Sequence, residues 1–270
     1  MGLTGSLQAT GLFEAGFILR GRLSMDTTQL EQTLVLIKPD ALKNSVTGFL
    51  LSQLSEFHTG SRFAAAKIVN VNRMLAEEHY AEHRGKGFYA ALLDYITGKV
   101  HYAQDAWKRR VIAIVYLGPN SVRAVRDIAG PTNPHKARDE RPGCLRALGT
   151  VVPIVDAQGN KIDDRMDNLI HASANHEDAE REIKLWFIPH DIPPLMRAFP
   201  TEVCQTHYYY KNDCIFNTYE SDSVIILAPG DVAWASDLEI LRQQTPGQPS
   251  AGKLGKVVAK YLINRSTQDQ

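Results

Sequence analysis

TLVLIKPDAL, residues Thr33–Leu42, is the segment of this chain that says most about its fold. Its first half, Thr33–Ile37, is a short apolar run of the kind that forms a buried strand. Lys38, Pro39 and Asp40 come next, and proline followed by aspartate ends a strand and begins a loop. The sequence therefore predicts a buried strand with charged side chains at its mouth.

The segments that follow alternate between strand and helix patterns. Two further apolar runs, Phe63–Val71 and Val111–Leu117, predict strands. Apolar residues at helical spacing predict helices at Gly48–Phe57, Leu75–His83, Phe88–Ile96, Ser121–Ala129 and from the cap Asn175 toward Phe187. This order favours an α+β fold, a ferredoxin-like, mostly antiparallel sheet with helices on one face.

Two stretches read as insertions between these elements. Residues 99–110 (KVHYAQDAWKRR) are polar and basic. Residues 151–166 read as a β-hairpin, in which VVPIVD and KIDDRM flank the turn Ala157–Asn160. Neither stretch carries an obvious chemical motif.

The N-terminal segment, residues 1–31, is expected to be a leader, and the second methionine, Met25, leaves open whether residues 1–24 are an upstream start outside the native protein. It contains an apolar patch, Gly11–Leu19, but Glu14 interrupts the patch and no basic residue precedes it. These features argue against a signal peptide.

The C-terminal extension, residues 188–270, is broken by prolines. It contains a strand candidate at Ser223–Leu227, a linker at Thr245–Gly252 and a helix candidate at Leu254–Ile263. The extension is too hydrophobic for disorder and has few long periodic elements for a private core. We therefore expect it to fold back on the rest of the chain as an accessory layer.

Composition narrows the classes of function. Lysine plus arginine (30) balance aspartate plus glutamate (30), so the net charge does not favour nucleic acid as a partner. The sequence has no apolar run long enough to span a membrane. Its three cysteines, Cys144, Cys204 and Cys214, form no paired framework, which is typical of a reduced, cytoplasmic protein.

Short motifs in a fixed order carry a resemblance to a known family. They are Lys38-Pro39-Asp40, Glu78-His79-Tyr80, Gly130-Pro131-Thr132-Asn133-Pro134, Pro142-Gly143-Cys144-Leu145-Arg146, Asn168-Leu169-Ile170-His171-Ala172-Ser173 and Ala179-Glu180-Arg181-Glu182-Ile183. Together they resemble the nucleoside diphosphate kinases over residues 32–187. The resemblance implies transfer of the terminal phosphate of a nucleoside triphosphate to a nucleoside diphosphate by a ping-pong mechanism.

The resemblance also implies a set of catalytic residues. His171 would be the nucleophile that holds the phosphate as phosphohistidine, and Glu182 would be the carboxylate that fixes its ring. Imidazole suits this role because it is nucleophilic near neutral pH and its second nitrogen can be held by a carboxylate. Tyr80 would pack beside the histidine, and Lys38 and Ser173 complete the catalytic set.

Phosphoryl transfer needs positive charge around the phosphate oxygens. The resemblance implies that cationic side chains supply this charge at the nucleotide-binding site. There, Arg126, Thr132 and Arg146 would bind the phosphates. Lys38 and Asn168 would bind the sugar, and Phe88 and Leu92 would bind the base. The second wall of the base site stays open, because the hairpin 151–166 falls at that place. No Walker P-loop is present, so we expect Mg²⁺ to bridge the phosphates with no dedicated protein ligands.

The chain departs from the family at several positions. Ala172 replaces the usual glycine, and Cys144-Leu145 replace threonine and isoleucine. The two insertions lie around the rim of the active site and around surfaces that the family uses to assemble. A homo-oligomer is expected, but its form stays open.

Two other functions compete with the kinase. One is a nucleotide-binding or scaffolding module of the same fold that acts through its extension, although an inactive relative would be expected to lose the histidine. The other, nucleic-acid binding, rests on the basic run Trp107–Arg110 alone, and such runs are usually solvated. Nucleotide preference and the roles of the insertions and the extension stay undetermined.

Overall fold

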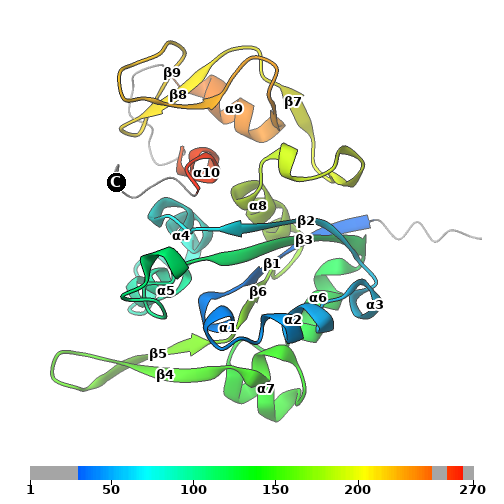
Figure 1. The fold of residues 1–270 in the computed structure, drawn as a ribbon, viewed down its shortest axis with the longest axis vertical. Coiled ribbons are helices and arrows are strands. Elements are labelled where there is room, and N and C mark those ends of the chain that lie inside the picture. Colours follow the sequence, from blue (N-terminus) through cyan, green and yellow to red (C-terminus); the bar gives the residue numbers. More distant parts are fainter. Residues whose placement is uncertain (1–29, 245–253, 264–270) are drawn as a thin grey trace, which may run out of the picture.

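A four-stranded antiparallel sheet in the order β2-β3-β1-β6 forms the centre of the molecule (Figure 1). The computed structural model describes residues 30–244 and 254–263. The strands of the central sheet are β1 (Leu30–Ile37), β2 (Arg62–Val69), β3 (Val111–Pro119) and β6 (Ile170–Ala172). Helical crossovers join β1 to β2 and β3 to β6, so the expected ferredoxin-like α+β class is confirmed.

The central strand β1 is buried on both faces, because its apolar side chains alternate between two cores. Leu34 and Leu36 belong to the first core, and Val35 and Ile37 belong to the second core. All four side chains are fully buried. The sheet therefore needs a cover on each face.

Helices supply this cover on both faces rather than on one. The crossover helices α2 (Thr47–Gln53) and α6 (Ser121–Ala129) pack in the second core, as the ferredoxin-like pattern requires. The first core is covered by α4 (Arg73–His79), α5 (Tyr89–Ile96) and α8 (His176–Trp186), and Figure 1 shows α4 and α8 across the sheet from α2 and α6. The expectation of helices on one face holds for the crossover helices alone.

Helix ends agree with the sequence in some places and not in others. Asn175 caps α8 as expected, because its side chain accepts a hydrogen bond from the Asp178 amide. The single helix expected over Gly48–Phe57 is interrupted instead, since Ser55 takes an extended conformation and begins a new helix. The remaining short helices of the central part are α1 (Pro39–Lys43), α3 (Glu56–Thr59) and α7 (Pro134–Glu140).

The expected hairpin is present. Strands β4 (Thr150–Val155) and β5 (Lys161–Asp167) form a separate two-stranded sheet that projects from one end of the molecule, beside α7 (Figure 1). The other insertion, residues 99–110, contains one 3₁₀ turn at Ala106–Lys108.

Beyond Phe187 the chain forms a set of short elements. A three-stranded sheet has the order β10-β8-β9, and a two-stranded sheet pairs β11 with β7. The elements are β7 (Thr201–Val203), β8 (Tyr208–Lys211), β9 (Cys214–Phe216), β10 (Val224–Leu227), β11 (Val232–Trp234), α9 (Ala235–Gln243) and α10 (Gly255–Val258). Strand β10 lies where the sequence predicts one.

The extension docks on α4 and α8. Trp234 and Ala259 of the extension are part of the first core, together with Trp186 and Phe187. The indole Nε1 of Trp234 donates a hydrogen bond of 2.7 Å to the Phe187 carbonyl. The extension therefore shares a core with the sheet.

The extension also has a core of its own, contrary to expectation. Its members include Tyr208, Ile226, Leu238 and Val257, and Met74 of α4 packs against both this core and the first one. Some of its apolar residues come from strands of three or four residues, which are too short to show a period in the sequence, and others come from α9 and α10.

Two expected features lie outside the described residues. These are most of the leader, at residues 1–29, and the linker, at residues 245–252. Within residues 30–244 and 254–263, no helix combines the length and the apolar character needed to cross a bilayer.

Candidate active site

A cavity of about 390 Å³ collects side chains from widely separated parts of the chain. It is lined from one side by α4 and α5, from another by β6 and α8, and from a third by the hairpin. Apart from Ser173, every site residue expected from the sequence lines this cavity: Lys38, Tyr80, Phe88, Leu92, Arg126, Thr132, Arg146, Asn168, His171 and Glu182.

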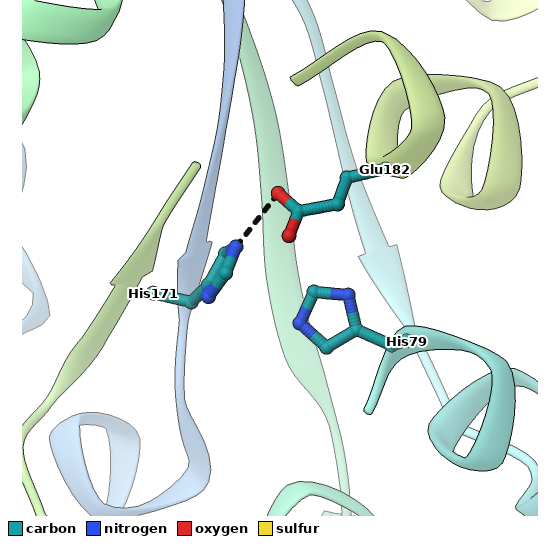
Figure 2. Close-up of side chains that lie close together, drawn as sticks. All are labelled: His79, His171 and Glu182. Atoms are coloured by element: carbon teal, nitrogen blue, oxygen red, sulfur yellow. Dashed lines mark hydrogen bonds and ion pairs between the residues drawn. The ribbon is translucent and has the colours of Figure 1, made fainter. Parts of the chain in front are cut away.

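His171, the middle residue of β6, is held by a carboxylate from α8. Its Nε2 lies 2.8 Å from Oε2 of Glu182 (Figure 2). A carboxylate can only accept a hydrogen bond, so Nε2 carries the proton of the neutral ring and Nδ1 keeps a lone pair. The side chain of His171 is 18% exposed, which leaves it accessible from the cavity.

Glu182 is fixed in turn by its neighbours. The Ser173 hydroxyl donates to the same carboxylate oxygen at 2.7 Å, so Ser173 acts behind the cavity wall rather than in it. Burial raises the pKa of Glu182, but the nearby His171 and the hydrogen bonds from His171 and Ser173 outweigh burial and lower the pKa to about 2. Glu182 is therefore ionised at any physiological pH.

A second histidine, His79, lies beside His171. It is the last residue of α4, is 2% exposed, and its ring centre lies 4.6 Å from that of His171. Trp186, on α8, donates from its indole Nε1 to Nδ1 of His79 at 3.2 Å. Burial lowers the pKa of His79 well below its usual value, with a smaller contribution from His171, so the ring is neutral.

Lys38 and Asn168 form a linked pair at the end of β1. The Lys38 ammonium donates to Oδ1 of Asn168 at 2.7 Å, and Nδ2 of Asn168 donates to the Thr132 carbonyl at 2.8 Å. The ammonium also lies 5.1 Å from the ring centre of Tyr95. Burial lowers the pKa of Lys38 to about 8, and the opposing charge of Asp40 offsets burial only in part.

Backbone strain lies between Asn168 and His171. Leu169 has a left-handed conformation with φ at +69°, which leucine rarely adopts and which costs about 1–3 kcal/mol. Asp40 accepts a hydrogen bond from the Leu169 amide at 2.9 Å, and the Lys38 amide donates to the Leu169 carbonyl at 2.9 Å. The loop after β1 therefore holds the strained residue in place.

Arg146 is positioned by a glycine turn. Gly130 ends α6 with φ at +78°, and a Cβ there would lie 2.1 Å from Sγ of Cys144, so only glycine fits. The Gly130 carbonyl accepts a hydrogen bond of 2.8 Å from Arg146. Burial, together with the charge of Arg126, lowers the pKa of Arg146 to about 10, which leaves it charged at neutral pH.

Three guanidinium groups and an ammonium thus line one cavity, and one of the guanidinium groups, that of Arg165, is paired with Asp167. Arg126, Arg146 and Lys38 have the charge and the donors to hold the oxygens of a polyphosphate. His171 lies in the same cavity, so a phosphate held there has a nucleophilic nitrogen beside it.

An apolar part of the cavity has walls from two elements. Phe88 and Leu92 come from the start of α5, and Ile154 and Met166 come from the hairpin. The hairpin is therefore a second wall, at the place that the sequence left open. Its alternation of residues could not show which face lines a cavity, because that depends on where the hairpin docks.

Other lining residues were not selected from the sequence. Tyr95 follows Leu92 by one helical turn, so helical spacing could have indicated it, whereas the only signal for His79 is its place next to Tyr80 in a quoted motif. The hairpin acids Asp163 and Asp164 had no comparable signal.

The carboxylates that line the cavity determine how a divalent cation could be bound there. Glu182 is bonded to His171 and Ser173, and Asp164 pairs with Lys161 at 2.8 Å. The lining also contains the carboxylates Glu82, Asp163 and Asp178, and four cationic side chains offset their charge. This set of donors suits a cation held chiefly by phosphate oxygens and water, as Mg²⁺ prefers, rather than by a cage of protein ligands.

The basic run Trp107–Arg110 lies outside this cavity. Lys108 pairs with Asp105 at 2.9 Å, and Arg109 donates to the carbonyls of Tyr102 and Ala103. Much of its charge is therefore used to hold the insertion itself.

Comparison with known proteins gives a consistent set of relatives. The family model described as nucleoside diphosphate kinase matches residues 31–192. The chain is similar to the nucleoside diphosphate kinase of Pyrococcus furiosus, with 38% identity over 170 residues, which are 63% of this chain and 91% of the relative. It is also similar to that of Thermus thermophilus, with 36% identity over 163 residues, 60% of this chain and 99% of the relative.

Solved structures include similar proteins. A crystal structure of the Aquifex aeolicus nucleoside diphosphate kinase has 29% identity and a TM-score of 0.48, and the match covers 61% of this chain and 99% of that one. A transition-state mimic of the Borrelia burgdorferi enzyme with bound vanadate and ADP has 28% identity and a TM-score of 0.47, with 63% and 94% covered.

Proposed function

The chain belongs to the nucleoside diphosphate kinase family, and from this premise we propose that it moves the terminal phosphate between nucleotides through a phosphohistidine at His171. The observation that carries the proposal is the state of the His171 ring. Its Nε2 is held by Glu182, and its Nδ1 keeps a lone pair in a cavity lined by four cationic side chains, those of Lys38, Arg126, Arg146 and Arg165.

The reaction has two symmetrical steps. In the first, the Nδ1 lone pair attacks the terminal phosphorus of a nucleoside triphosphate; an N–P bond forms, and the P–O bond breaks with its electron pair going to the departing diphosphate. In the second, a terminal oxygen of another nucleoside diphosphate attacks the same phosphorus, and the electron pair of the N–P bond returns to Nδ1. No electrons are gained or lost overall.

The other site residues position groups and stabilise charge. Glu182 stabilises the positive charge that His171 gains on attack, and Ser173 holds Glu182. Arg126, Arg146 and Thr132 bind the phosphates, which is where electrostatic stabilisation of phosphoryl transfer is needed. Tyr80 packs beside the histidine.

The nucleoside part is bound in the rest of the cavity. Lys38 and Asn168, already joined by a hydrogen bond, contact the sugar hydroxyls. Phe88 and Leu92 form one apolar wall for the base, and Ile154 and Met166 of the hairpin form the other.

Enzymes of this family commonly use a divalent cation, and we propose that it is Mg²⁺. The cation neutralises charge on the phosphates when bound. Among the lining carboxylates, Asp163 and Glu82 make the fewest hydrogen bonds to described groups and would hold its water shell.

The same proposal covers the molecule as a whole. The kinase domain is residues 32–187, with insertions at 99–110 and 151–166, between a leader (1–31) and an extension (188–270). A homo-oligomer is supported by the edge strand β2, which exposes Phe63. A cytoplasmic location is supported by three free cysteines.

Labelling tests the mechanism directly. Incubation with [γ-³²P]ATP is expected to give phosphate on the protein that is labile to acid and stable to base, and His171→Ala is expected to lose it while still binding nucleotide. Steady-state rates should give parallel double-reciprocal lines. His207→Gln, an exposed histidine of the extension, is the control.

Intersecting lines, or turnover that persists in His171→Ala, would contradict the proposal. A chain that binds nucleotide and takes up no label would instead be the non-catalytic module.

A further inference from the structure

His79, His171 and Glu182 form a compact group that resembles a metal site. Each offers one ligand atom, and the three atoms lie within 4.8 Å of one another. Two histidines and one glutamate are a ligand set that Zn²⁺ uses. Figure 2 shows one ring nitrogen of His79 directed toward His171, with the Glu182 carboxylate above them.

The hydrogen bond from Trp186 argues against a metal. An indole N–H can only donate, so Nδ1 of His79 must accept at 3.2 Å and carries no proton. The neutral ring then has its proton on Nε2, and a protonated nitrogen has no lone pair for a metal. His79 therefore presents an N–H donor to this group of residues.

This donor has no partner in the resting protein. Nε2 of His79 is buried, and no residue that the structure describes accepts a hydrogen bond from it. A buried donor without an acceptor is rare, because it loses its bonds to water and gains nothing. The neighbouring Glu182 oxygen already accepts from both His171 and Ser173.

We propose that His79 is a further catalytic residue, whose Nε2–H donates a hydrogen bond to an oxygen of the phosphoryl group while that group is transferred to and from His171. This inference rests on the proposed function. The phosphoryl oxygens are the acceptors that arrive beside His171 during the reaction, so the donor is satisfied only when the phosphoryl group is present. An interaction absent from the free enzyme and formed with the transferred group lowers the barrier. The proton stays on His79 throughout.

Trp186 is part of the same device. By fixing Nδ1 as the acceptor, it selects the tautomer in which Nε2 carries the proton. Trp186 is fully buried and its ring lies edge-on to His79, with ring centres 5.5 Å apart. Trp186 is therefore a positioning residue that acts through His79.

Two substitutions test the roles of the two ring nitrogens of His79 separately. In His79→Gln the side-chain amide reaches the place of Nε2 and keeps a donor there. In His79→Asn the shorter amide reaches the place of Nδ1, so it can accept from Trp186 but offers no donor to the phosphoryl group. Rapid-quench measurement of His171 phosphorylation by ATP is expected to show a loss of about tenfold or more in His79→Asn, and a rate within about threefold of the original in His79→Gln.

The equilibrium constant for phosphorylation of His171 by ATP would not change if His79 had only a structural role, so it provides a second test. His79→Asn is expected to shift the balance between ATP plus free enzyme and ADP plus phosphoenzyme toward free enzyme, at unchanged ATP affinity. Equal rates and equal equilibria in both variants would overturn the inference. Failure of the proposed function looks different, because the unmodified chain would then carry no phosphate on His171.

Nuclear magnetic resonance of the unmodified chain tests the tautomer without any substitution. The ¹⁵N shifts of His79 are expected to show a proton on Nε2 and none on Nδ1, and titration with Zn²⁺ alone is expected to leave them unchanged. A proton on Nδ1, or Zn²⁺ bound at His79 and His171, would overturn the inference and identify the cluster as a metal site.

Discussion

Two basic side chains of this site, Lys38 and Arg146, are charged although they are buried, and burial disfavours the charged form. Lys38 is 6% exposed and Arg146 is 5% exposed, yet each carries a proton at neutral pH. Burial keeps them free of water, so their interaction with a phosphate is stronger than at a surface. The same burial makes Lys38 sensitive to pH.

The pKa of Lys38 predicts an alkaline limit to activity. With its pKa lowered to about 8 by burial, Lys38 loses its charge as the pH rises through that value. We expect kcat/KM, which reports the free enzyme, to fall above about pH 8. Lys38→Ala should lower kcat/KM at pH 7 by about tenfold or more and remove the fall. Persistence of the same fall in Lys38→Ala would show that another group causes it; Lys136→Gln, an exposed lysine on α7, is the control.

Glu182 predicts a stability effect in the acid range. Its pKa in the folded chain, about 2, lies below its ordinary value of 4.5, so ionised Glu182 stabilises the fold above about pH 4.5, and this stabilisation is lost as the pH falls toward 2. Chemical denaturation of the original chain and of Glu182→Gln should therefore give a difference in free energy of unfolding that narrows from pH 5 to pH 2. A constant difference would contradict this; Glu177→Gln, exposed on the same helix, should show little difference at any pH.

For single residues, the sequence could predict which side chains lie in the site, but it could not predict their protonation, tautomer or backbone conformation. Motifs contain His171, Glu182 and Arg146, the family resemblance added Arg126, and the cavity contains all four. The tautomer of His79 and the strain at Leu169 depend on partners more than 100 residues away, Trp186 and Asp40, respectively. No local pattern encodes such contacts.

Among the elements, the hairpin β4–β5 has the clearest separate effect on the site. A two-stranded hairpin alone is marginally stable, and this one lies beside α7 with one side toward the cavity. Its alternation predicted the strands correctly. The docking that turns Met166 inward is a tertiary contact and could not be predicted from that pattern.

The hairpin predicts an effect on binding rather than on chemistry. Met166→Ala removes apolar contact with the base in ground state and transition state alike, so KM should rise by about tenfold with kcat little changed. Initial rates over a range of nucleotide concentrations measure both constants. Val155→Ala, at a position 52% exposed on β4, should change neither. A fall in kcat at constant KM would contradict the assigned role of the wall.

At the scale of the whole molecule, the hydrophobic cores are continuous, so we expect the central sheet and the extension to unfold together. The extension shares the first core through Trp234 and Ala259, and Met74 joins that core to the extension's own. Hydrophobic composition predicted the docking, because the extension is too apolar to stay unfolded. The extension's own core combines α9 and α10 with short strands, whose pairing is not visible in the sequence.

Shared cores predict a single unfolding transition. Loss of activity and loss of native tryptophan fluorescence should coincide in urea. Trp234→Phe, which leaves the Phe187 carbonyl without its buried donor, should lower the free energy of unfolding by about 1–3 kcal/mol. Trp107→Phe, at a position 79% exposed, should have no such effect. Two separated transitions would show that the extension is an independent domain.

The hydrogen bond from Trp234 to the Phe187 carbonyl also has a consequence for synthesis. During translation, α4 and α8 leave the ribosome well before the residues that cover them, and about 75 residues separate Phe187 from the end of the described extension. At about 5–20 residues per second, roughly 4–15 s pass in which the apolar outer sides of both helices face water. We therefore expect a holding chaperone to protect the newborn chain during this interval, so its yield in a cell-free system should rise when such a chaperone is supplied.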